Sequence, residues 1–188
     1  MAPLTIDEYE AVARERMERA AYDYYAGGAD DEVTLAANRA AFDRIRLRPR
    51  VLVDVSAIDT STTVLGQRLD FPVMLAPTAF NRLAHPDGEL AAARAARASG
   101  TLMIGSTLST CAIEEVAGAC GGGLWFQVYV YKDRALTRDL VARAEACGCR
   151  ALVLTVDTPR LGLRRRDVRN RFVLPFLFHD YFWEDSYF

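Results

Sequence analysis

From residue 71 onward, the sequence alternates between short apolar runs and longer helix-like segments, with a repeat of roughly 25 residues. The apolar runs, which we expect to be strands, cover residues 71–76, 101–104, 124–130 and 151–156, and helices are expected at 87–99, 113–119 and 133–147. Strands with few polar positions that alternate with helices form parallel sheets covered on both faces. We therefore expect an α/β fold in which residues 71–175 form the first four βα units of a (β/α)8 TIM barrel.

A doubly wound sheet has a similar rhythm of strands and helices. In that fold a Gly-rich turn usually follows the first strand. Here the first expected strand is followed by Pro77-Thr78-Ala79-Phe80, which is not such a turn. The barrel is therefore the favoured architecture.

Residues 1–70 are expected to form a helical preface that ends in a small hairpin. Thr5 and Glu8 have the spacing of a capping box at a helix start, and Gly27-Gly28 has the character of a helix end. A second helix is expected at 31–42, and a hairpin at 62–69. The last segment, 176–188, is set apart as an aromatic-rich divergent tail.

Composition excludes several classes of function. The net charge of -2 provides no field for binding nucleic acid or an anionic membrane, and no apolar run is long enough to cross a bilayer. The first ten residues are acidic and polar, unlike a signal peptide. Two of the four cysteines lie one residue apart in a Gly-rich turn and two lie near small-residue helices, and we interpret them as reduced thiols of an intracellular protein. The alternative, a metal site, is weakly indicated because Cys-x-Cys lacks a matching His or Cys pair. No metal, nucleic acid or membrane partner is expected.

Polar residues stand at the expected carboxyl ends of all four strands, where the active sites of barrels gather. They would suit a flat polar ligand, although polar tips are also common in any soluble barrel. Gln127 lies within an apolar strand, so its amide needs partners, either a heterocycle with imide groups or neighbouring backbone. Asp157 follows a buried strand and needs donors or a cation such as Arg160. The run Arg164-Arg165-Arg166 is typical of a solvated loop, although one member could bind a carboxylate.

Several segments resemble the FMN-dependent 2-hydroxy-acid oxidase and dehydrogenase family, in particular its glycolate oxidase branch. The resemblance runs from about Leu4 to Pro175. It is carried, in order along the chain, by Tyr22-Asp23-Tyr24-Tyr25-Ala26-Gly27-Gly28-Ala29, Ala76-Pro77-Thr78-Ala79, His85-Pro86-Asp87-Gly88-Glu89, Phe126-Gln127-Val128-Tyr129-Val130-Tyr131-Lys132-Asp133-Arg134, Thr155-Val156-Asp157-Thr158-Pro159-Arg160 and Arg169-Asn170-Arg171-Phe172.

The resemblance implies FMN as the cofactor and the oxidation of a small (S)-2-hydroxy acid to a 2-oxo acid, with oxygen as acceptor. Tyr129 would hydrogen-bond the substrate and favour the charge that develops on it, and Asp157 would orient a catalytic histidine. Tyr24 and Arg164 would bind the substrate carboxylate; without the resemblance, Tyr24 would be taken for a core-facing helix residue. The flavin would be lined by Pro77, Thr78 and Ala79 and hydrogen-bonded by Ser106, Gln127 and Thr155.

Leu108 departs from the pattern of the glycolate oxidase branch, which carries a Trp at this position over the active site. A smaller apolar side chain leaves room for a larger substrate. We therefore expect a specificity that is not restricted to glycolate.

The resemblance also implies a catalytic His, a second carboxylate-binding Arg, a Lys near the flavin and phosphate-binding loops in the second half of the barrel. The sequence does not reach them, and His85 and His179 do not match the catalytic position. We expect little or no oxidase activity from this chain alone. The alternative to an oxidase is thus a truncated, inactive fragment that at most binds flavin or associates with other subunits. The resemblance is compatible with a homo-oligomer that is cytoplasmic in a bacterium or peroxisomal in a eukaryote.

Overall fold

The computed structural model describes residues 2–157 and 162–173, and these residues fall into two compact units. The helical unit comprises the described residues up to Ile58 together with 162–173, and the sheet unit comprises 59–157. The hairpin thus falls with the strands and not with the preceding helices, with which it was expected to group. His179, the segment Thr158-Pro159-Arg160 and the aromatic tail lie outside the described residues.

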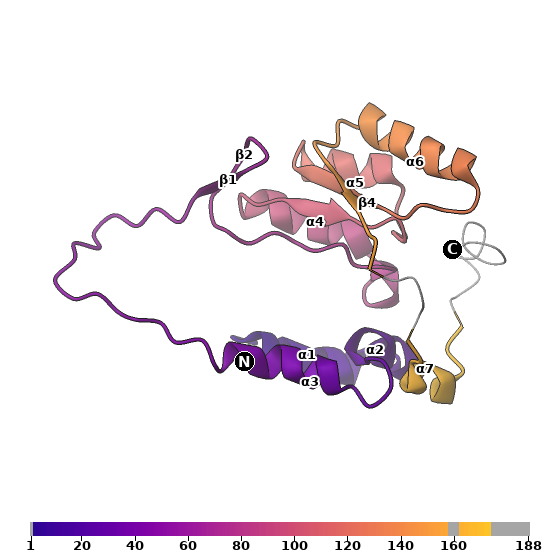
Figure 1. Ribbon diagram of the computed structural model, residues 1–188, viewed down its shortest axis with the longest axis horizontal. Coiled ribbons are helices and arrows are strands. Elements are labelled where there is room, and N and C mark those ends of the chain that lie inside the picture. Colours follow the sequence, from indigo (N-terminus) through magenta and orange to yellow (C-terminus); the bar gives the residue numbers. More distant parts are fainter. Residues whose placement is uncertain (1, 158–161, 174–188) are drawn as a thin grey trace. The chain divides into compact units, whose positions relative to one another are not determined.

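Four short helices make up the regular structure of the helical unit (Figure 1): α1 (Ile6–Arg16), α2 (Arg19–Ala26), α3 (Val33–Phe42) and α7 (Arg165–Asn170). The predicted cap of α1 is confirmed, because the Thr5 hydroxyl accepts a hydrogen bond from the Glu8 N–H at 3.2 Å. The single helix expected up to Gly27 is instead two helices, since Met17 adopts an extended conformation. Gly27 ends α2, as expected.

The sheet unit begins with the antiparallel hairpin β1 (Thr62–Val64) and β2 (Gln67–Leu69), which confirms the expected hairpin. Three parallel strands follow in the spatial order β3 (Met103–Gly105), β4 (Leu124–Val128) and β5 (Leu152–Leu154). The expected strand at 71–76 is reduced to one parallel bridge between Leu75 and Met103. Pro72 and Pro77 flank this bridge, and neither has an N–H to donate to a ladder.

Helices α4 (Gly88–Ala98), α5 (Ile113–Cys120) and α6 (Arg134–Ala146) alternate with these strands, as predicted. Asp133 caps α6 through a 2.7 Å hydrogen bond from the Ala135 N–H. Gly100 ends α4 in the left-handed region, at φ +66°, where a Cβ would also collide with Asp70. A short 3-10 helix, η1 (Asn81–Leu83), lies in the loop before α4.

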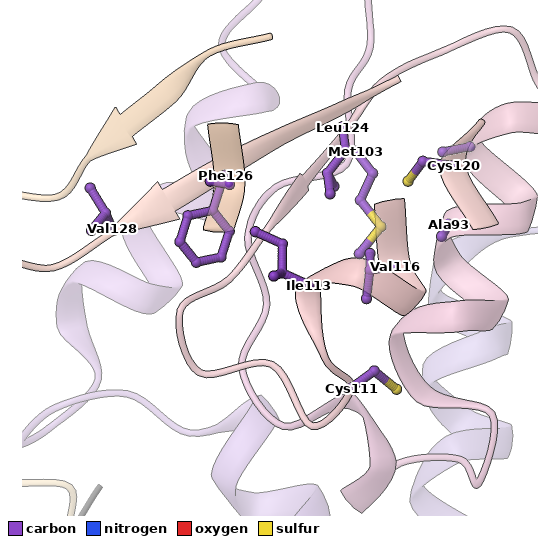
Figure 2. Packing of buried hydrophobic residues seen from close by; sticks show 11 residues of the cluster. Ala93, Met103, Cys111, Ile113, Val116, Cys120, Leu124, Phe126 and Val128 are labelled. Atoms are coloured by element: carbon purple, nitrogen blue, oxygen red, sulfur yellow. The ribbon is translucent and has the colours of Figure 1, made fainter. Parts of the chain in front are cut away.

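The core of the sheet unit lies between the strands and these helices. Because side chains alternate across a strand, Leu124, Phe126 and Val128 of β4 face the helices, where eleven buried residues form one apolar cluster (Figure 2). Trp125 faces the other way and packs with Leu69 of the hairpin and with Leu102. The sheet is thus fixed on both faces around β4, the strand that also carries Gln127. None of the described helices is long and apolar enough to span a lipid bilayer.

Candidate active site

The carboxyl ends of the parallel strands converge on Gln127. This residue is 2% exposed and lies on the opposite face of β4 from the helices. Its Oε1 accepts a hydrogen bond from the Thr107 N–H at 3.1 Å, and its Nε2 donates to the Thr155 hydroxyl at 2.9 Å. The Thr107 hydroxyl also donates to the Gln127 carbonyl. One buried amide therefore joins the ends of β3, β4 and β5.

The amide of Gln127 retains capacity for a further partner. A primary amide offers two N–H groups and two lone pairs, and the bonds to Thr107 and Thr155 use one of each. The Thr155 hydroxyl accepts from Gln127 and still has its own proton to donate. These groups fit the imide and carbonyl edge of a flavin ring. Neighbouring backbone, the other partner considered from the sequence, already satisfies part of the amide.

Ser106 and the loop after Leu75 lie near this point. Ser106 is buried directly after β3, and its hydroxyl oxygen accepts a hydrogen bond from the Leu108 N–H at 3.0 Å. Leu75 bridges β3 next to it, so Pro77, Thr78 and Ala79 follow a neighbouring chain segment in the same direction. The Thr78 hydroxyl is exposed and donates to the Ala76 carbonyl at 3.4 Å. The structure thus places Ser106, Gln127 and Thr155 at the carboxyl ends of adjacent strands, and Pro77, Thr78 and Ala79 shortly after the bridge at Leu75.

Tyr129 and Asp157 stand just beyond the ends of β4 and β5. Burial of the Tyr129 phenol raises its pKa above the usual value, and the negative charge of Asp157 raises it further. The phenol is therefore protonated at neutral pH and can donate a hydrogen bond. Asp157 itself is exposed. A phenol donor and a carboxylate thus stand at the same ends of the strands as Gln127.

Tyr24 and Arg164 belong to the helical unit, which brings these two predicted residues together. The Arg164 guanidinium lies 5.2 Å from the centre of the Tyr24 ring and donates a hydrogen bond to the Tyr24 carbonyl. It also donates to Asp167 at 2.5 Å. The other face of the pair is aromatic, since Phe172 stacks on Tyr24 with ring centres 5.0 Å apart. Arg164 thus already holds one carboxylate.

The run Arg164-Arg165-Arg166 does not form the solvated loop that is typical of such a run. Arg165 and Arg166 lie in α7 and pair with acidic groups near α2 and α3: Arg166 with Glu32 at 2.5 Å, and Arg165 with Asp31. In Glu32, the hydrogen bonds from Arg166 and from the Gly28 N–H hold the pKa below its usual value. The sequence pattern gave no indication of these partners, because they lie more than a hundred residues away along the chain.

Sequence reasoning assigned no individual role to Thr107, Asp167 or Phe172. Thr107 carried a signal as a polar residue at the end of an expected strand, and Phe172 stands in a segment that carries the resemblance, whereas Asp167 carried none. His85 lies apart from the cluster around Gln127, as an exposed residue whose Nδ1 accepts from the Asp87 N–H at 3.2 Å before α4. Among the residues that the structure describes, no group of His, Cys, Asp and Glu could hold a metal ion.

Comparison with known proteins gives relatives of one kind. A family model described as FMN-dependent dehydrogenase matches residues 13–184. Glycolate oxidase 1 of Zea mays is 57% identical over 168 residues, and glycolate oxidase of Spinacia oleracea is 55% identical over 170 residues. The two alignments cover 89% and 90% of this chain but 46% of each relative. The chain therefore spans about half the length of these curated relatives.

Solved structures agree in fold. A crystal structure of mandelate oxidase superposes with a TM-score of 0.89 at 42% identity, covering 94% of this chain and 51% of that one. Mandelate oxidase with (S)-4-hydroxymandelic acid gives the same TM-score and identity, with coverage of 93% and 49%. The predicted fold class, the N-terminal half of a TIM barrel after a helical segment, is confirmed. This chain belongs to the FMN-dependent dehydrogenase family.

Proposed function

We propose that the protein represented by this chain oxidises a small (S)-2-hydroxy acid to the 2-oxo acid, with FMN as cofactor and oxygen as final acceptor. The observation that carries the proposal is the buried Gln127 amide, which joins three parallel strand ends and keeps polar capacity for a ring with imide groups. Family membership and the glycolate oxidase relatives support the same chemistry.

The flavin would lie across the strand ends. Ser106, Gln127 and Thr155 would hydrogen-bond its polar edge, and Pro77, Thr78 and Ala79 would line it through backbone and small side chains. When bound, FMN supplies the two-electron acceptor that the protein itself lacks. Because Gln127 is anchored by Thr107 and Thr155, its amide is held in place before any ligand arrives.

Four residues would act on the substrate or on its histidine base. The Tyr129 phenol, protonated at neutral pH because its pKa is raised, would donate a hydrogen bond to the substrate oxygen. Asp157 would orient a histidine base supplied by another part of the protein. Arg164 would bind the substrate carboxylate with Tyr24, and in doing so would exchange its present partner Asp167 for the substrate.

The residue at position 108 bears on the size of the substrate. Leu108 follows the buried strand end at Ser106, in the place where the glycolate oxidase branch carries a Trp. A mandelate oxidase mutant has been solved with (S)-mandelic acid, an aromatic 2-hydroxy acid that is larger than glycolate. We propose that the substrate is larger than glycolate. The variant Leu108→Trp should favour glycolate over mandelate, and an unchanged preference would contradict this assignment.

A second candidate is a non-catalytic chain that associates with other subunits. It is favoured by the exposure of the apolar residues of β5, since Leu152 is 44% and Leu154 is 54% exposed. Exposed strand residues with an unpaired edge are ready sites of association. We also propose that the protein forms a homo-oligomer, located in the cytoplasm of a bacterium or in the peroxisome of a eukaryote.

Two measurements test the proposed function. FMN titration followed by fluorescence quenching should show saturable binding, and Gln127→Met should weaken it about tenfold, because the Thr107 N–H loses its buried partner. The matched control is Gln67→Met in the hairpin, whose partner is Trp125. Peroxide release from glycolate, lactate and mandelate then separates an oxidase from a chain that only binds flavin. Absence of FMN binding by the wild-type chain would overturn the proposal for this chain.

A further inference from the structure

Glu89 is a fully buried carboxylate that the proposed function leaves without a role. It stands in the first turn of α4 and is 0% exposed, although it belongs to the charged segment His85-Pro86-Asp87-Gly88-Glu89. Burying a carboxylate is costly unless several donors satisfy it. A buried Glu at this place therefore indicates that specific hydrogen-bond donors surround its carboxylate.

Donors from two different loops surround this carboxylate. Its Oε1 accepts hydrogen bonds from the Asn81 N–H at 3.1 Å and the Thr110 N–H at 2.8 Å, and its Oε2 accepts from the Thr110 hydroxyl at 2.5 Å. Burial alone would raise the pKa of Glu89. The bonds from Thr110 and Asn81, with one from its own backbone, outweigh that effect and hold the pKa below its usual value.

The two loops are those that follow adjacent strand positions at the candidate active site. Loop 76–88 follows Leu75 and includes Asn81, and loop 106–112 follows β3 and includes Thr110. They are also joined directly, since the Phe80 N–H donates to the Leu108 carbonyl at 2.9 Å. The Arg82 N–H donates to the Thr110 hydroxyl oxygen at 3.3 Å.

Backbone geometry shows that this junction is tightly built. Phe80 adopts a left-handed conformation at φ +56°, which bulky residues avoid unless their surroundings impose it. Gly88 has φ +48°, and a Cβ there would approach the Arg82 side chain to 2.7 Å. Any other residue at Gly88 would push Arg82 away from Thr110. Where the two loops surround the Glu89 carboxylate, the backbone thus adopts uncommon conformations at Phe80 and Gly88.

We propose that Glu89 is a positioning residue, whose carboxylate holds loops 76–88 and 106–112 in one arrangement and so places Ala79 and Ser106 for the flavin. The placement of the flavin rests on the proposed function above. Joining of the loops by Glu89 does not depend on it. Glu89 acts through Asn81 and Thr110 and touches neither flavin nor substrate.

Three variants test the proposal. Glu89→Leu keeps the approximate size of the side chain and removes both acceptors, whereas Glu89→Gln keeps one acceptor oxygen and loses the charge. Glu114→Gln is the matched control, because Glu114 is a half-exposed carboxylate at the start of the next helix, paired with Arg143. If Glu89→Leu fails to fold, Glu89→Gln carries the test alone.

The first measurement is amide hydrogen exchange of the flavin-free chain. Glu89→Leu should accelerate exchange of the Asn81 and Thr110 amides about 30-fold or more, and Glu89→Gln about three- to tenfold, because charged acceptors bind amides more strongly than neutral ones. Exchange in β4 and α6 should stay as in Glu114→Gln. Unchanged exchange at Asn81 and Thr110 in the Gln variant would overturn the proposal.

The second measurement is FMN affinity, with the visible circular dichroism of the bound flavin. Glu89→Gln should weaken binding and change the dichroism, while the melting temperature follows that of the control. A lower melting temperature with unchanged affinity and dichroism would reduce Glu89 to a stabilising residue and overturn its positioning role. If the wild-type chain binds no FMN, the proposed function fails for this chain, and the exchange result alone decides whether Glu89 joins the loops.

Discussion

The helical unit and the sheet unit are held together by different interactions. Among the described residues of the helical unit only Ala21 and Asp23 are buried, and its segments are joined by ion pairs between α7 and the region from Asp23 to Glu32. The sheet unit carries the cluster of eleven buried apolar residues around β4. The same chain therefore combines a unit whose cohesion depends on charge with one whose cohesion depends on apolar burial.

Because of this difference, the proposed flavin contacts and the proposed carboxylate contacts should respond differently to salt and pH. The proposed flavin contacts lie on the apolar-cored unit, where Gln127 is fixed by packing on both faces of β4. The proposed carboxylate-binding pair, Tyr24 and Arg164, lies in the charge-dependent unit. Salt and pH should consequently affect the proposed contacts to the substrate carboxylate before they affect the proposed flavin contacts, because surface charges are screened and apolar burial is not.

The largest effect is expected from truncating the core of the sheet unit. Phe126→Ala removes a ring that is 4% exposed, and it should lower the free energy of unfolding by about 3–5 kcal/mol. Urea unfolding followed by far-ultraviolet circular dichroism measures this loss. The control is Phe42→Ala in α3, where the ring is 74% exposed and a change within about 0.5 kcal/mol is expected. Equal losses in the two variants would contradict the contrast between the units.

A smaller effect is expected from the buried charge of the helical unit. Asp23, 3% exposed, accepts hydrogen bonds from Arg19 at 2.7 Å and from Asn170 at 2.9 Å. Asp23→Asn should destabilise this unit by about 1–3 kcal/mol, read as lower exchange protection of α2 and α7 with β4 unchanged. The control is Asp7→Asn, since Asp7 forms an exposed pair with Arg39.

The pH dependence of this site follows from its pKa. Burial raises the pKa of Asp23, but the bonds from Arg19 and Asn170 outweigh it and leave the pKa below the ordinary value. A lowered pKa means that the stabilisation is complete above about pH 4 and is lost as the pH falls through the folded pKa. Protection of α2 should therefore drop in acid in the wild-type protein and much less in Asp23→Asn. An identical acid response in both would refute the assignment.

The smallest effect is expected from the surface pair of the sheet unit. Arg143 donates two hydrogen bonds of 2.9 Å to Glu114, and these bonds, together with one from the Glu114 backbone, lower the pKa of Glu114 to about 2. Carboxyl NMR should show this midpoint rise toward about 4 in Arg143→Gln. Because Glu114 is 51% exposed, the loss of stability at pH 7 should not exceed about 1 kcal/mol. The pair's contribution disappears between about pH 4 and pH 2, and Arg143→Lys, which keeps the charge, should retain part of it.

The sequence predicted those elements whose formation depends on residues that are close together in the chain. Ala-rich helices with capping residues, such as α6 after Asp133, and the hairpin around Gly66 are where local preference and tertiary structure agree. The break at Met17 and the helix α7 were not predicted. No Gly or Pro marks the first, and the partners of α7 lie more than a hundred residues earlier in the chain.

The residues of the candidate site also divide into those whose role the sequence indicated and those whose role it did not. Gln127 was recognisable because an amide within an apolar strand demands partners, and the structure supplies Thr107 and Thr155. The stacking of Phe172 on Tyr24 was not recognisable, because it depends on where distant segments meet. Glu89 lies within the segment His85-Pro86-Asp87-Gly88-Glu89, but its burial is visible only once the two loops are placed.

The helical unit is assembled from two stretches of chain that are separated by the whole sheet unit. On a ribosome, its first three helices emerge long before Arg165 and Arg166 do. Until then Asp31 and Glu32 must remain hydrated, and the last helix can dock only after about a hundred intervening residues have been made. The amino-terminal part is thus among the first to be synthesised and among the last to be completed, so a nascent chain that has emerged only as far as residue 157 should contain an ordered sheet unit preceded by loosely held helices.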